Sequence, residues 1–201
     1  MSASTSTPTH SNRRTRLNSA FKHLMSLHWA MLHCYILLFF TGPLMTHLPR
    51  ELWGRGSMYD FHKGVGVLTV ILLSWRILTL LRVWWKKYTR RWPKQTPQWW
   101  RTVVFHSSLY VFMWAVPLSG FMLSNGYKSN NVRFLGVVLP DIFPEDPALR
   151  DLGGTLHFWL GYLFLAFVVL HGIDQWKVVK AFWRRLKQSF SGGSRGSSPQ
   201  A

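Results

Sequence analysis

The sequence predicts an all-α fold, an integral membrane four-helix bundle whose N- and C-termini both lie in the cytoplasm. Three observations lead to this fold class. The chain of 201 residues is 48% hydrophobic and contains 12 Trp, which is rich for a soluble protein. Its apolar residues are gathered into four blocks, and its net charge of +17 is concentrated in alternate connections between them.

Each apolar block has 21 or 22 residues, the length that a helix needs to span the hydrocarbon core of a bilayer. Helices buried in soluble domains seldom all reach this length, so we interpret the blocks as transmembrane helices. Together they form one predicted domain, residues 24–180, between a disordered basic tail (1–23) and a basic, then Gly/Ser-rich tail (181–201). The predicted helices are 24–45, 61–81, 102–123 and 156–176.

The basic residues lie on one side of the predicted bundle. Residues 1–23, 82–101 and 177–201 carry seventeen Lys and Arg and no Asp or Glu, whereas opposite charges balance in the remaining segments. This alternation follows the positive-inside rule and places both termini in the cytoplasm. It argues against a nucleic-acid role, which would not require it, and favours contact with anionic lipid headgroups. The sequence leaves the fold of the outer connection, 125–155, open.

The fourth predicted helix carries two histidines, His157 and His171, at fourteen residues' separation. In an α-helix this separation is about 21 Å and just under four turns, so both rings point from nearly one face. One membrane helix therefore offers two metal ligands, one near each surface of the bilayer.

The predicted topology pairs these histidines with two others at matching depths. His62 and His157 lie near the outer face (the outer pair), and His28 and His171 lie near the cytoplasmic face (the inner pair). Each pair could hold a haem iron between opposed imidazoles. His106 competes for the inner site, and its other possible role is proton exchange with a quinone. For any single histidine, a hydrogen bond across helices is the simpler explanation, but ionisable residues inside a membrane mark functional sites.

Other residues fit a haem between these helices. Arg76 follows His62 by fourteen residues and shares its helix face, where we expect a contact with an anionic haem propionate. A salt bridge to Asp174, or snorkelling to the inner surface, is the alternative. Several glycines near the histidines would let a flat macrocycle approach the backbone, or would serve close helix contact. These are Gly64, Gly66, Gly161 and Gly172.

The chain resembles the prokaryotic cytochrome b561 family of four-helix membrane cytochromes over about residues 24–180. The resemblance rests on SLHW at 26–29, FHKGVGVLTVILLSWRI at 61–77, FHSSLYVFMWAVPLSGFML at 105–123, and LHFWLGY with VVLHG at 156–162 and 168–172. It implies two non-covalent b haems, held by His28, His171, His62 and His157. It also implies electron exchange with quinone and, for some members, superoxide oxidation outside coupled to ubiquinone reduction.

We therefore expect an oxidoreductase or electron carrier of a respiratory electron transport chain, in a bacterial plasma membrane or a photosynthetic membrane. Its cofactors would be two haem b, and its partners membrane lipid, quinone and a redox protein. Two alternatives stay open. The chain could be the cytochrome b anchor subunit of a larger dehydrogenase or hydrogenase complex. It could also be a haem-free transporter or scaffold whose histidines move ions or protons.

Overall fold

The computed structural model describes residues 10–49, 51, 54–88, 95–177, 180–181, 183–184 and 188, without the side chains of 10–21 and 86–88. Within this part of the chain, four helices are long and apolar enough to cross a membrane, which confirms the predicted fold class. A helix satisfies its own backbone hydrogen bonds, which lipid cannot do. The helices are α1 (His10–His47), α2 (Arg55–Tyr88), α3 (Pro97–Tyr127) and α4 (Pro147–Asp174).

The helices extend beyond most of the predicted boundaries. The first begins at His10, inside the segment expected to be disordered, and the fourth begins nine residues before position 156 and ends at Asp174. The predicted boundaries followed the thickness of the hydrocarbon core, whereas helical hydrogen bonding continues into the headgroup layer. Residues 1–9 and 189–201 of the predicted tails lie outside the described residues.

Capping residues explain where α3 and α4 begin. The Thr96 hydroxyl accepts a hydrogen bond from the backbone N–H of Trp99 (3.2 Å). The Asp146 carboxylate accepts from the backbone N–H groups of residues 148 and 149 (2.6 and 3.1 Å). A proline follows each cap at the first helical position, where its missing N–H costs nothing and its fixed φ suits a helix. The dipeptides Thr-Pro and Asp-Pro thus mark these helix starts in the sequence.

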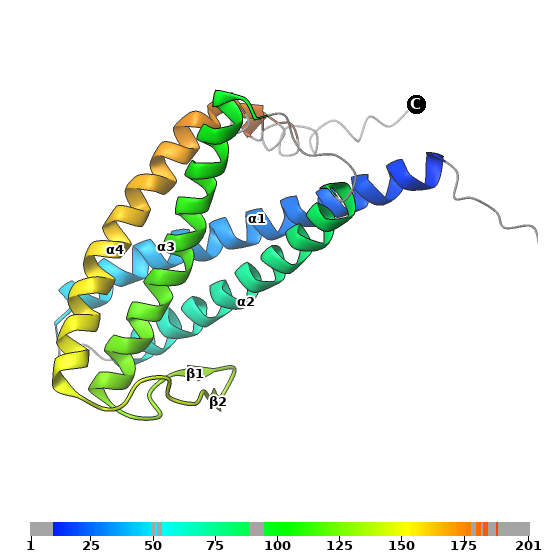
Figure 1. Ribbon diagram of the computed structural model, residues 1–201. Helices are drawn as coiled ribbons and strands as arrows, with labels where there is room; N and C mark the ends of the chain where they lie inside the picture. The colour runs from blue at the N-terminus through cyan, green and yellow to red at the C-terminus, as the bar shows by residue number, and fades with distance from the viewer. Residues whose placement is uncertain are drawn as a thin grey trace, which may run out of the picture.

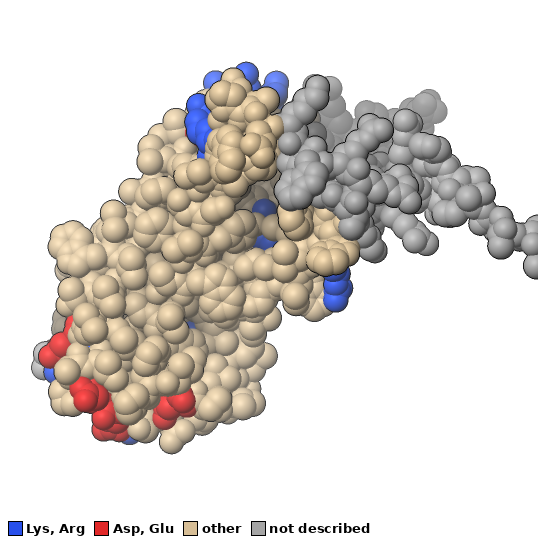
Figure 2. Space-filling model, in the orientation of Figure 1, with Lys and Arg blue, Asp and Glu red and all other residues tan. Residues whose placement is uncertain are grey.

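The bundle consists of two antiparallel helix pairs, α1 with α2 and α3 with α4. Figure 1 shows the two pairs crossing, with the described chain ends at one end of the bundle and the segment 128–146 at the other, the hairpin end. Acidic side chains gather at the hairpin end, whereas Lys and Arg predominate towards the opposite end (Figure 2). The charge separation seen in the sequence therefore becomes a separation along the long axis of the bundle.

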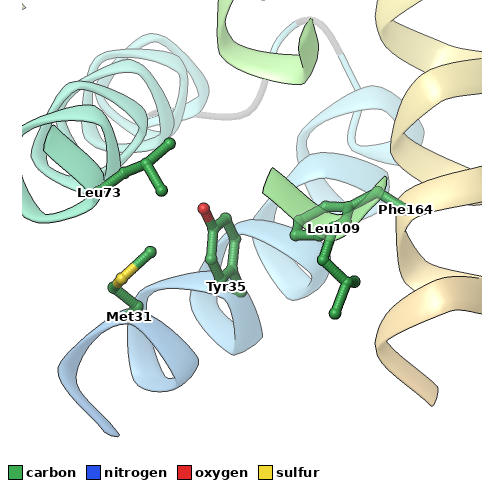
Figure 3. Close-up of a cluster of buried hydrophobic side chains, with 5 residues drawn as sticks. All are labelled: Met31, Tyr35, Leu73, Leu109 and Phe164. Carbon is green, nitrogen blue, oxygen red and sulfur yellow. The ribbon is translucent and has the colours of Figure 1, made fainter. Parts of the chain in front are cut away.

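A cluster of buried apolar side chains joins all four helices at mid-height. Met31 and Tyr35 come from α1, Leu73 from α2, Leu109 from α3 and Phe164 from α4 (Figure 3). Phe164 is only 1% exposed and is seven residues from each histidine of its helix. The cluster therefore lies between the levels of the outer and inner pairs.

The connection between α3 and α4 is fixed by a buried asparagine. Asn125, which is 0% exposed, donates a hydrogen bond to the Asp141 carboxylate (2.5 Å) and accepts one from the backbone N–H of Ile142 (3.2 Å). The segment contains an antiparallel hairpin of β1 (Arg133–Phe134) and β2 (Val137–Val138). The sequence had left the fold of this connection open, and a side chain at its base decides it.

Replacing Asn125 with alanine is expected to loosen this connection. The substitution leaves the Ile142 N–H without its acceptor and removes one of the two hydrogen bonds to the Asp141 carboxylate, which still accepts from the Asn130 backbone N–H (2.8 Å). We expect a cost of about 1–3 kcal/mol. Limited proteolysis of the purified protein in detergent would then cleave within residues 128–146 faster than in the unmodified protein. Ser129→Ala, which removes only an exposed hydroxyl contact with Glu145 (3.1 Å), should change the cleavage rate little. Equal cleavage of both variants would contradict the role of Asn125.

Candidate functional site

The structure brings the four predicted histidines together as two neighbouring pairs. The ring centroids of His62 and His157 are 6.2 Å apart, and those of His28 and His171 are 6.3 Å apart. In both pairs the ring planes are close to perpendicular, at 84° and 80°. Each pair joins one helix of the first antiparallel pair to α4, so the arrangement depends on the tertiary packing of the two halves.

The spacing of the rings fits a metal held between them. An iron–imidazole bond has about the length of a zinc–imidazole bond, about 2.0 Å, and a ring nitrogen lies about 1.15 Å from the ring centre. Two imidazoles on opposite faces of one iron therefore have centroids about 6.3 Å apart. Both histidine pairs have this spacing, so their residues fit the group that the sequence predicts.

Hydrogen bonds set the tautomer of both outer histidines. Nδ1 of His157 lies 2.9 Å from the Val116 carbonyl oxygen, which can only accept, so this nitrogen carries the proton. Nδ1 of His62 lies 3.0 Å from the Thr41 hydroxyl, whose own hydrogen is donated to the Leu37 carbonyl (2.8 Å). Both Nδ1 atoms are therefore donors. Each Nε2 therefore carries a lone pair with which it could bind a haem iron.

Glycines surround the outer pair in two different ways. A Cβ added at Gly42 would lie 3.5 Å from the His62 ring, and one added at Gly120 would lie 3.1 Å from the His157 ring. Gly66 and Gly161 each follow an outer histidine by one turn on its own helix face, and an added Cβ there would meet nothing within 4 Å. The first two glycines seat the rings against α1 and α3, and the other two leave open space beside them.

The remaining predicted glycines help to decide between the two roles expected from the sequence, which were room for a flat macrocycle and close helix contact. Gly172 also faces open space, and Gly64 makes only an ordinary contact, 3.8 Å from the Arg133 carbonyl. Close helix contact therefore does not explain Gly66, Gly161 or Gly172 among the described residues. The tight helix contacts lie instead at Gly126 and Gly153, where an added Cβ would come within 2.6 and 2.5 Å of backbone nitrogen.

The inner pair has a different environment. Nδ1 of His171 is buried and has no hydrogen-bond partner among the described residues, while the Phe105 ring stacks on its imidazole at 6.0 Å and 23°. The His106 ring is nearer to His171 than the His28 ring is, at 5.2 Å. That distance is about 1 Å too short for an iron between the two rings. The spacing therefore favours His28 over His106 as the partner of His171.

Arg76 lies at the inner level, between α1 and α3. Its Nε donates to the Tyr110 hydroxyl (3.1 Å) and its Nη1 to the Leu24 carbonyl (3.0 Å). The salt bridge with Asp174 considered from the sequence is not formed among the described residues, and Asp174 instead lies 3.7 Å from Arg101. Arg76 is therefore a cation inside the bundle without an acidic partner in the described part of the chain. The two hydrogen bonds use its Nε and Nη1 and do not involve Nη2.

The partners of the outer histidines were missed from the sequence. Thr41 and Gly42 precede Pro43 in α1, and Ser119 and Gly120 follow Pro117 in α3. In each helix a hydroxyl residue, a glycine and a proline occur within one turn, and this repeated combination is the signal that could have found them. The proline removes one backbone donor from the helix ladder, and the Val116 carbonyl that holds His157 directly precedes it.

Comparisons with known proteins found similar sequences. A family model described as prokaryotic cytochrome b561 matches residues 22–174, which include all four histidines and all four candidate membrane spans. A curated protein of Escherichia coli (strain K12), cytochrome b561 homolog 2, is 26% identical to this chain over 152 residues. The match covers 73% of this chain and 77% of that protein.

Proposed function

The chain belongs to the prokaryotic cytochrome b561 family, which implies haem b binding and electron transfer, and from this premise we propose that it is a di-haem cytochrome that carries electrons across the membrane. His62 and His157 would hold the outer haem, and His28 and His171 the inner one. The observation that carries this proposal is the equal spacing of the two pairs, 6.2 and 6.3 Å.

The residues around each iron suit electron transfer more than ligand activation. Haem supplies one-electron chemistry when bound. An iron held by the two imidazoles of a pair would have no position left for oxygen. Hydrogen bonds from His62 to Thr41 and from His157 to the Val116 carbonyl hold the outer rings in place. Fixed ligands need little rearrangement when the charge of the metal changes, which favours rapid electron transfer.

The layer between the two sites is packed with aromatic rings. The Phe164 ring lies 5.0 Å from Tyr35 and 6.3 Å from Phe112. Phe112 in turn contacts Phe167 at 5.0 Å, and Phe167 contacts Phe105 at 5.7 Å. These rings bring the apolar packing from mid-height down to the inner pair. Such a dry layer keeps water away from the path between the sites and limits solvent reorganisation.

We further propose quinone as the electron acceptor at the inner level. Reduction of a quinone to a quinol takes two electrons and two protons, so the site needs a group that exchanges protons. His106 is suited to this role because its Nδ1 is bound to the Thr102 carbonyl (2.8 Å), which leaves Nε2 able to take up and release a proton. Superoxide as the one-electron donor at the outer level is supported by the resemblance to the family alone.

Haem quantification of the purified protein tests the central proposal. We expect two b-type haems per chain and a reduced-minus-oxidised difference spectrum of bis-histidine haem. A colourless protein would favour a haem-free transporter, and one haem per chain would show that only one of the two histidine pairs binds. Co-purification with a second subunit in equal amount would identify the chain as an anchor subunit.

Replacing His106 with alanine is expected to leave both haems in place, because its ring is too close to His171 to share an iron with it. Quinone reduction by the dithionite-reduced protein should slow at least tenfold, since a positioned proton-transfer group typically contributes about 100- to 10,000-fold. Stopped-flow mixing with a water-soluble ubiquinone analogue measures this rate. Loss of one haem in this variant would instead make His106 the inner ligand.

A further inference from the structure

We propose that Thr41 is a positioning residue that lowers the redox potential of the outer haem site relative to that of the inner one. The inference deepens the proposed di-haem function and rests on it. It comes from a contrast between the two histidine pairs: their ring spacings are equal, but the groups around them are not.

Both outer histidines donate from Nδ1 to an oxygen acceptor. His157 donates to the Val116 carbonyl (2.9 Å) and His62 to the Thr41 hydroxyl (3.0 Å). Such an outer hydrogen bond makes an imidazole a more basic ligand. A more basic ligand stabilises ferric over ferrous iron and lowers the reduction potential. Because both ligands of the outer site carry this bond, their effects add.

Among the described residues, His171 of the inner site lacks this stabilisation of ferric iron. Nδ1 of His171 is buried without a hydrogen-bond partner in the described part of the chain, and its nearest rings, Phe105 and His106, lie at 6.0 and 5.2 Å. An imidazole without an acceptor is a weaker base towards the metal. The missing hydrogen bond at His171 by itself gives the inner site the higher redox potential.

Arg76 acts in the same direction at the inner level. It is held by the Leu24 carbonyl and the Tyr110 hydroxyl and has no acidic partner among the described residues. Leu24 lies one turn before His28 on α1, which places the cation beside the inner pair. A positive charge in a medium of low dielectric constant favours the state of the iron with one electron more, so Arg76 raises the inner potential further.

Unequal potentials give the electron a preferred direction. When bound by the outer and inner pairs, the two haems would supply one-electron transfer from the outer site to the inner one, with no proton or bond changed. An outer one-electron donor would supply each electron, and a quinone would take two of them in succession with two protons. Transfer towards the basic end of the bundle is then downhill, and the reverse transfer is uphill.

A spectroelectrochemical titration of the purified holoprotein tests the inference. The unmodified protein should titrate as two components of equal amplitude. Thr41→Val, which keeps the shape of the side chain but removes the acceptor, should raise the potential of the lower component only. Thr41→Ser, which keeps the hydroxyl, should restore it. Thr79→Val is the matched control, because the Thr79 hydroxyl bonds, among the described residues, only to the Trp75 carbonyl of its own helix (2.8 Å). It should shift neither component.

Arg76→Gln supplies an independent measurement. It should lower the higher component, whereas Arg76→Lys, which keeps the charge, should lower it less. The inference is overturned if the unmodified protein titrates as two haems of equal potential, or if Thr41→Val shifts the higher component. Failure of the proposed function would look different, because the haem content measured before titration would then fall below two per chain.

Discussion

Replacing His157 with alanine is expected to halve the haem content, from two haems per chain to one. The outer site would then keep only one of its two imidazoles, that of His62, to hold an iron. The remaining haem, at the inner pair, should keep its spectrum because His28 and His171 are untouched. The number of haems per chain is measured by extracting haem with pyridine and dividing its amount by the protein concentration from amino-acid analysis.

The same variant should stop electron transfer across the bundle while leaving the inner haem reducible. In sealed vesicles, an impermeant reductant on the outer side would no longer reduce the remaining haem. His33→Ala is the matched control, since this histidine lies on the exposed side of α1 and, within the described part of the chain, bonds only to the Trp29 carbonyl of its own helix (2.7 Å). It should retain two haems. If the His157→Ala variant kept both haems, His157 would not hold the outer haem, and the proposed outer site would be wrong.

Replacing Gly153 with alanine is expected to cause the largest loss of stability. An added Cβ would lie 2.5 Å from the backbone nitrogen and 2.9 Å from the Cα of Leu123, and backbone atoms cannot turn aside as a side chain can. The α3–α4 pair would have to separate at the hairpin end. Overpacking of this kind typically costs about 1–3 kcal/mol and at times more, and close helix approach in membranes depends on such small residues.

The neighbouring glycine provides the control. A Cβ at Gly154 would meet only the end of the Leu123 side chain, at 3.5 Å, which is an ordinary contact. Gly154→Ala should therefore unfold at the same temperature as the unmodified protein, whereas Gly153→Ala should unfold several degrees lower. Thermal release of haem, followed by absorbance in detergent, reports both. If the two variants unfold at the same temperature, the contact of Gly153 with the Leu123 backbone does not determine the stability of the protein.

Much of the candidate site could be predicted from the sequence because helical periodicity and membrane depth are local properties. The separation of His157 and His171 set their common face, and the alternation of basic segments set the depth of His28 and His62. Haem binding at these residues stays a prediction that the measurements above decide. Arg76 could be placed on its helix face from spacing alone, but its hydrogen bonds to Leu24 and Tyr110 come from other helices and could not be foreseen.

What the sequence by itself determined is the number of membrane helices, their approximate positions and the levels at which histidines occur, since chain composition over about 20 residues controls insertion into lipid. The tertiary structure alone decided which groups surround those histidines. The Val116 carbonyl is a backbone atom that any residue would supply, and the backbone contact of Gly153 with Leu123 joins two helices. Hydrogen bonds and close approaches of this kind depend on positions in space to within an ångström, and residue types and spacings do not specify such positions.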